Sequence, residues 1–85
     1  MKKEFRCIIS GQRNPDLHHV KSRKSGGADD DWNLCPLSRK HHTEIHQLGT
    51  TTFANKYPEF KNWLLANGWE YIELLNKWRG PNVRK

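Results

Sequence analysis

The sequence lacks long apolar runs and contains few cysteines. No apolar stretch approaches the roughly 18 residues that a membrane-spanning helix requires. The basic N-terminal segment Met1–Arg6 is followed by no apolar stretch, so we expect no secretory signal peptide. The two cysteines, Cys7 and Cys35, are too few for a disulfide scaffold and are typical of a reducing compartment. We therefore expect a cytoplasmic protein with no membrane partner.

Apolar residues are also scarce for a folded chain. Only 34% of the 85 residues are hydrophobic, whereas 28% are charged. A chain of this length buries only about 60–70% of its unfolded surface, so a bound metal or a partner would help to stabilise it. Internal repeats and low-complexity segments are absent. We expect a single domain over residues 1–85.

Acidic residues are in the minority. Fifteen Lys and Arg side chains stand against nine Asp and Glu, which gives a net charge of +6. A basic surplus attracts polyanions, because neutralising phosphates releases their counterions. The composition therefore favours a nucleic-acid partner over a protein that is merely basic and soluble.

Short strands are expected in the first half of the chain. Residues 5–9 form an apolar, β-branched run, and a further strand is expected at 16–20. Gly11, Asn14 and Pro15 mark a turn between them. A polar loop is expected over 21–31, followed by a strand at 33–37, where Pro36 favours a sheet edge.

Helices are expected in the second half. Ser38 is a suitable N-cap for a helix that runs through His46 and stops at Gly49. Apolar spacing then predicts three further helices. The first starts near Thr51 or Thr52, the second runs from Pro58 to Gly68, and the third runs from Trp69 to Trp78. The fold class is therefore α+β, with a helical C-terminal extension over about 50–80.

All five histidines lie between His18 and His46. His42 and His46 are four residues apart, so a helix places both imidazoles on one face, where they can hold one ion. His18 and His19 are adjacent on an expected strand, so one of them can join the helix pair while the other faces elsewhere. Three protein ligands with open positions are typical of a catalytic metal site.

The residues around the histidines are more ambiguous. Asn33 is expected to accept a hydrogen bond from an imidazole and fix its tautomer, or to cap a turn, and both roles can hold at once. His41 is expected to pack in the core or face phosphate. The run Asp29–Asp31 is expected to keep a loop exposed to solvent or to cap a helix rather than to bind a metal.

The histidine pattern resembles the HNH nuclease motif of the ββα-metal fold. Asn33 follows His19 by 14 residues, His42 follows Asn33 by nine, and His46 follows His42 by four. This spacing, within about residues 5–49, is similar to the three-histidine site of the colicin-type DNases. Neighbouring segments also resemble small HNH proteins of phages and prophages: 17–20, 26–27, 33–34, 36–37 and 41–42.

The resemblance implies a role for each motif residue. It assigns one divalent ion to His18, His42 and His46, the general base to His19, and the central asparagine of the motif to Asn33. The implied activity is metal-dependent hydrolysis of DNA to 5′-phosphate and 3′-hydroxyl ends, in a bacterial or phage-infected cell. From the residues alone, His18 and His19 can exchange roles. Imidazole ligands favour Zn, Ni, Co or Mn over Mg, although none of the five is excluded.

The sequence departs from the family at a second metal site. Many HNH proteins hold a structural zinc with two Cys-x-x-Cys pairs. The corresponding segments here are 7–10, which begins with Cys7, and 38–41, which ends with His41. Serines occupy the other two places, Ser10 and Ser38. Two ligands, even with Cys35 nearby in the sequence, do not make such a site, so we expect no structural zinc.

Basic residues flank the expected site and are candidates for phosphate contacts: Lys21, Arg23, Lys24, Arg39 and Lys40. The tryptophans of the C-terminal half have helical spacing, so we expect them in the core rather than against bases. No recognition helix is evident, which favours nicking that has low sequence specificity or is directed by DNA structure. Double-stranded DNA is the expected substrate. Single-stranded or branched DNA and RNA stay open as substrates. The alternative is a non-catalytic, metal-containing module that binds nucleic acid.

Overall fold

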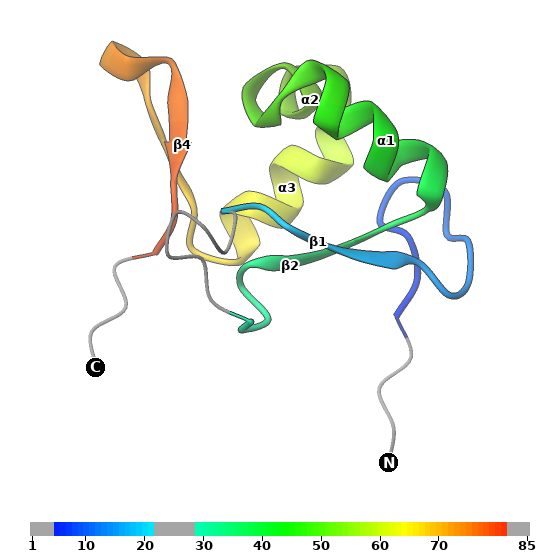
Figure 1. The fold of residues 1–85 in the computed structure, drawn as a ribbon. Coiled ribbons are helices and arrows are strands. Elements are labelled where there is room, and N and C mark those ends of the chain that lie inside the picture. Colours follow the sequence, from blue (N-terminus) through cyan, green and yellow to red (C-terminus); the bar gives the residue numbers. More distant parts are fainter. Residues whose placement is uncertain (1–4, 22–28, 82–85) are drawn as a thin grey trace.

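Three helices pack over a small β-hairpin, and a second hairpin stands at one end of the molecule (Figure 1). The chain is seen here as a computed structural model that describes residues 5–21 and 29–81. The α+β class is confirmed by the three helices and two small sheets of these residues. Within the same ranges, no helix is both long and apolar enough to cross a membrane.

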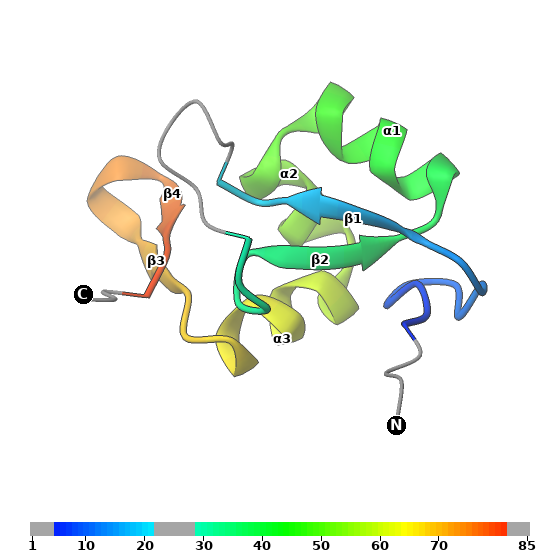
Figure 2. The ribbon, with the colours of Figure 1, turned by 60° about the horizontal axis from the view of Figure 1, so that its bottom comes forward.

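The first sheet pairs two of the expected strands. Strand β1 (Asp16–His19) runs antiparallel to β2 (Leu34–Leu37), with His18 opposite Cys35 and His19 opposite Leu34. A two-stranded sheet consists only of edges, which is why Pro36 is tolerated inside β2. Helix α1 (Arg39–Leu48) follows β2 directly and lies beside β1 (Figure 2).

Helix α1 has the expected ends. Ser38 occupies the N-cap position, although its hydroxyl contacts the His41 ring instead of a backbone amide. Gly49 ends the helix at a φ of 88°, a left-handed conformation that glycine adopts without a Cβ penalty. Ile45 and His41 are the buried residues of this helix and face the core.

Helices α2 (Thr50–Lys56) and α3 (Pro58–Ala66) build the core over the sheet. Phe53 and Phe60 are fully buried, with ring centroids 5.1 Å apart in a T-shaped arrangement. Glu44 of α1 accepts hydrogen bonds from Lys56 and Tyr57, which joins α1 to the end of α2. Both helices agree with the expected bounds to within about two residues.

The expected helix from Trp69 to Trp78 is wrong. The chain forms strand β3 (Glu70–Ile72), a 3-10 turn (Glu73–Leu75) and strand β4 (Lys77–Arg79). Tyr71 pairs with Trp78 across this hairpin, and Asn76 reverses the chain at a φ of 51°. Aromatic and β-branched residues favour such cross-strand pairs. The three-residue apolar spacing of this segment, which suggested a helix, is therefore also compatible with a hairpin.

The expected strand at residues 5–9 is also wrong. Arg6 makes an isolated bridge with Arg13, and the residues after Cys7 form a turn in which the Gly11 N–H donates to the Cys7 carbonyl. The Ile8 N–H donates to the Pro36 carbonyl, so this segment is anchored to the sheet without joining its ladder. Ser10 and Gly11 favour a turn, and this preference outweighs the tendency of the short apolar run to form a strand.

Candidate metal centre

Three histidines converge between β1 and α1. The ring atoms of His18, His42 and His46 that could bind a metal lie within 4.8 Å of one another. The Nε2 atoms of His42 and His46 are 3.2 Å apart. Metal–nitrogen bonds of about 2.0–2.1 Å in a tetrahedral site would place two ligand nitrogens about 3.4 Å apart. The donor set therefore fits one divalent ion with minor adjustment of the rings.

The fold explains why these three side chains meet. His18 points from β1 toward α1, where its ring centroid lies 5.0 Å from that of His42 and 5.1 Å from that of His46. The helix presents His42 and His46 one turn apart on the face beside the strand. Of the adjacent pair on β1, the structure thus groups His18, and not His19, with the helix histidines.

Burial keeps His18 in the form that can bind a metal. Removal from solvent lowers the pKa of His18 from 6.5 to about 4, with smaller contributions from the charges of His42 and His46. His18 is therefore neutral at pH 7 and retains a nitrogen lone pair. His42 is half-buried and His46 exposed, so the cluster is accessible from solvent on the His46 side.

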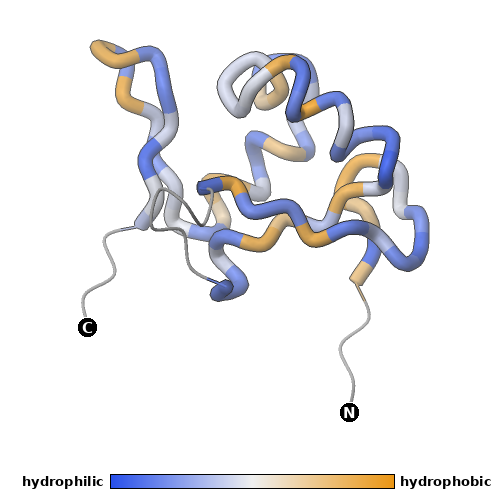
Figure 3. The backbone as a smooth tube through the Cα atoms, in the orientation of Figure 1, coloured by the Kyte–Doolittle hydropathy of each residue, from blue (hydrophilic) through white to orange (hydrophobic). Residues whose placement is uncertain are grey.

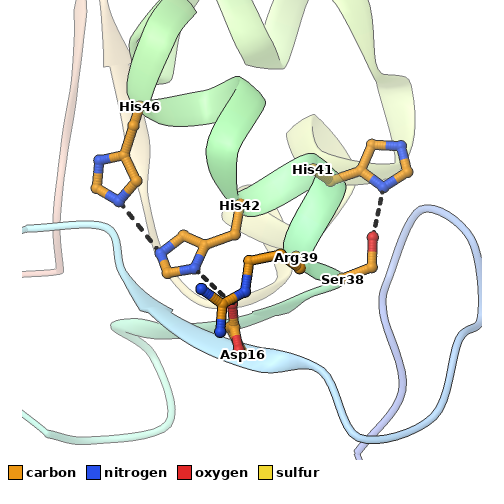
Figure 4. A network of polar contacts seen from close by, with 6 residues as sticks. All are labelled: Asp16, Ser38, Arg39, His41, His42 and His46. Atoms are coloured by element: carbon orange, nitrogen blue, oxygen red, sulfur yellow. Dashed lines mark hydrogen bonds and ion pairs between the residues drawn. The ribbon is translucent and has the colours of Figure 1, made fainter.

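A carboxylate on β1 orients one ligand. Asp16 Oδ2 lies 2.9 Å from His42 Nδ1 and 3.1 Å from Arg39 Nε (Figure 4). The hydrogen bond with His42, followed by the Arg39 charge, lowers the pKa of Asp16. A proton held on Nδ1 leaves His42 Nε2 as the free acceptor, directed toward His46. The sequence analysis missed Asp16, although it precedes His18 by two residues and so shares its strand face.

His19 faces a second carboxylate. Its Nε2 lies 2.7 Å from Asp29 Oδ1, and the ring is about 29% exposed. The acidic run was expected only to solvate a loop or cap a helix, so this contact of Asp29 is a correction. No sequence signal connects residues 19 and 29, because the pairing depends on how the intervening loop returns to β2.

Asn33 is fully buried and acts on the backbone at the end of β1. Its Oδ1 accepts from the Lys21 N–H at 2.8 Å, and its Nδ2 donates to the Lys21 carbonyl at 3.0 Å. The Val20 N–H also donates to the Asn33 carbonyl. These contacts agree with the turn-stabilising role, and they place the chain that follows His18 and His19.

The remaining histidine belongs to a buried polar cluster behind the metal centre. His41 Nδ1 lies 2.9 Å from Ser38 Oγ and 3.9 Å from Cys7 Sγ. The Ser10 N–H donates to the same sulfur at 3.4 Å. The two halves of the degenerate Cys-x-x-Cys pattern therefore meet in space, at the contact between Cys7 and His41.

The basic residues expected to contact phosphate are dispersed. Lys21 and Lys40 are exposed, and Arg39 is exposed while pairing with Asp16. Arg23 and Lys24 lie outside the residues that the structure describes. Lys21 follows the histidine pair on β1, whereas Arg39 and Lys40 begin α1, so the described cations flank the cluster at both ends.

No protein-family model, no curated protein and no solved structure matches this chain.

Proposed function

We propose that this protein is a metal-dependent endonuclease of the HNH type that hydrolyses phosphodiester bonds in DNA. The convergence of His18, His42 and His46 on one point is the observation that carries the proposal. The order β1, β2 and α1 around that point is consistent with a ββα-metal core, to which α2 and α3 would be additions. The spatial cluster agrees with the motif spacing, and both favour the same chemistry.

His18, His42 and His46 would hold one divalent ion. Such an ion supplies positive charge that stabilises the leaving oxygen and the phosphoryl oxygens during hydrolysis. Asp16 keeps His42 in the tautomer that leaves Nε2 free. Imidazole ligands favour Zn, Ni, Co or Mn, and Mg is the fifth candidate.

His19 is the proposed general base. Asp29 accepts a hydrogen bond from His19 Nε2–H, which leaves the lone pair on Nδ1 as the proton acceptor. A negative partner also stabilises the imidazolium that forms when Nδ1 takes a proton from the attacking water. Asn33 is a positioning residue, because it holds the backbone that follows this histidine.

The substrate class follows from charge. The net charge of +6 and the exposed cations at both ends of the cluster favour a polyanion. Lys21, Arg39 and Lys40 are the proposed phosphate contacts among the described residues, with Arg23 and Lys24 proposed from the sequence alone. One site per chain predicts single-strand nicks, and the HNH resemblance implies that they carry 5′-phosphate and 3′-hydroxyl ends.

The proposal is tested with supercoiled plasmid and metal-stripped protein. Mg, Mn, Ni, Co or Zn is added singly, and nicked circles are measured for the wild type, His19→Ala and His46→Ala. A positioned general base contributes about 100- to 10,000-fold to such a rate, so His19→Ala should lose nicking while it retains metal. Lys61→Ala, an exposed cation on α3, is the control and should nick like the wild type.

The competing function is a non-catalytic module in which the metal serves structure. It predicts that wild type and His19→Ala bind DNA equally and that neither cuts duplex, single-stranded or branched DNA with any of the five metals. That result would overturn the nuclease proposal. Nicking by His19→Ala at the wild-type rate would remove His19 as the base.

A further inference from the structure

A groove lies between the second hairpin and the end of the first sheet. Its volume is about 770 Å³, within the range of roughly 300–1,000 Å³ that is typical of ligand pockets. Its walls come from the end of β1, the start of α2 and the hairpin β3–β4. The Thr51 hydroxyl donates to the Asn76 carbonyl at 3.3 Å, which connects the hairpin tip to α2.

The groove contains none of the three histidines, but two of its lining residues follow them closely in the sequence. Strand β1 and helix α1 run side by side toward the hairpin (Figure 2). Lys21, on the groove wall, follows His18 by three residues, and Thr50 follows His46 by four. A chain molecule that extends from the groove along β1 and α1 would therefore reach the exposed side of the histidine cluster.

The walls combine aromatic rings with cations. Trp69 and Trp78 line the groove together with Lys21 and Lys77, and none of the described lining residues is acidic. Both lysines are exposed, and within the described residues no ion pair involves either of them. Arg79 also lines the groove, but its charge is paired with Glu70 at 2.7 Å.

The hairpin tip is apolar although it is in solvent. Leu74 is 98% exposed and Leu75 is 63% exposed, and the tip is drawn in the hydrophobic colour in Figure 3. Leu75 also lines the groove. Flat aromatic and apolar surface beside unpaired cations is the combination that binds a strand whose bases are free to stack.

We propose that this groove binds one unpaired nucleic-acid strand and leads it to the histidine cluster, an inference that rests on the proposed nuclease function. Bases stack against Trp78 and the apolar wall, and phosphates contact Lys21 and Lys77. A continuous duplex fits less well, because its base faces are hidden within the stack. An acidic peptide shares the negative charge but has no series of flat rings to stack.

The test measures binding without cleavage. Fluorescence anisotropy in EDTA compares a labelled single strand, its duplex and an abasic strand of equal length. The groove predicts that the single strand binds at least tenfold more tightly than the other two. Trp78→Ala should weaken single-strand binding by about 5- to 150-fold. Lys21→Ala and Lys77→Ala should each lower the slope of log Kd against log salt by about 0.7.

Lys61→Ala is the matched control, because it removes an exposed cation from α3, which does not line the groove. Trp78 also packs against the core, so the two lysine variants keep the test valid if Trp78→Ala unfolds. Equal binding of the abasic strand, or equal competition by polyglutamate, would overturn the inference. Loss of binding in Lys61→Ala that matches the loss in Lys77→Ala would also overturn it.

The outcome is separable from that of the nuclease proposal. If the wild type nicks plasmid and the groove variants bind a single strand as the wild type does, the nuclease function is supported and the groove is not the binding site. Weakened strand binding in the groove variants, without nicking by the wild type, would retain the groove as a binding site and remove the catalytic function.

Discussion

Asp16 contacts both His42 and Arg39, so one carboxylate connects the proposed metal ligand to an exposed cation. The hydrogen bond to Nδ1 selects the tautomer whose Nε2 can bind a metal. Residue types and spacing predicted that one of His18 and His19 joins His42 and His46, whereas the choice of His18 rested on the HNH resemblance. They did not predict the carboxylate partners, because Asp16 of β1 contacts a histidine of α1, and Asp29 lies ten residues from His19 in the sequence.

Asp16→Asn should weaken metal binding about 10- to 100-fold, because the amide is a poorer partner for the His42 N–H than a carboxylate. Isothermal titration of the metal-stripped variant gives the affinity. Glu70→Gln, which also changes an ion-paired carboxylate but lies on β3, should bind like the wild type. Wild-type affinity in Asp16→Asn would contradict the orienting role.

Cys7 holds its sulfur in a buried setting rich in N–H donors. Burial by itself raises the pKa of the thiol, but hydrogen bonds from Ser10 and from the backbone of Ser38 and Ile9 outweigh it. Together they lower the pKa of Cys7 from 9.0 to about 6. The folded protein therefore favours the thiolate more strongly than the unfolded chain does.

The stabilising contribution of this thiolate should be fully present above pH 9 and be lost as the pH falls toward 6. Thermal unfolding measured between pH 5.5 and 9 should show the melting temperature rising with pH. Cys7→Ser removes the titrating group, so its profile should be flatter over the same interval. Parallel profiles for the two proteins would show that other groups account for the dependence.

At the scale of the secondary-structure elements, Asn33 connects the two strands of the first sheet. Its side chain satisfies both backbone groups of Lys21 at the point where β1 ends. Because Asn33 is fully buried, water cannot replace these hydrogen bonds without rearrangement. Asn33 therefore stabilises the chain at Lys21, directly after the strand that carries His19.

Asn33→Ala should destabilise the protein by about 1–3 kcal/mol for each buried group left without its partner. Urea unfolding followed by circular dichroism measures the change. Asn62→Ala, an exposed asparagine on α3, is the control and should change stability by less than about 0.5 kcal/mol. A similar small change in Asn33→Ala would contradict the proposed role of the side chain.

The elements also show where sequence reasoning succeeds. Strands β1 and β2 and helices α1 to α3 have clear local signals, such as Ser38, Gly49 and Pro58 at helix ends. The segment from Trp69 to Trp78 does not, because its apolar spacing suits a helix while its residue types suit strands. Cross-strand contact between Tyr71 and Trp78 decides the outcome, and such a contact is not visible in local sequence.

At the scale of the whole molecule, the core is small, so a bound metal ion can contribute a large part of the stability of the fold. An ion held by His18 on β1 and by two residues of α1 would connect the sheet to the helix layer. Ligands that bind only the folded state stabilise it according to their concentration relative to Kd. The functional site and the stability of the fold are therefore expected to be coupled.

Metal removal should lower the melting temperature. At a metal concentration of 100 times Kd, binding adds about 2.7 kcal/mol, which corresponds to roughly 10–20 °C for a domain of this size. Differential scanning fluorimetry with and without EDTA measures the shift. His46→Ala should show little dependence on metal, and a shift equal to that of the wild type would place the stabilising ion elsewhere.

The three histidines should form one metal site, which calorimetric titration of the metal-stripped protein would reveal. With Zn, Ni, Co or Mn, the wild type should bind one ion per chain. His18→Ala, His42→Ala and His46→Ala should each lose that binding while their circular dichroism spectra show folded protein. Retention of one ion at wild-type affinity in any of these folded variants would show that the ion binds elsewhere.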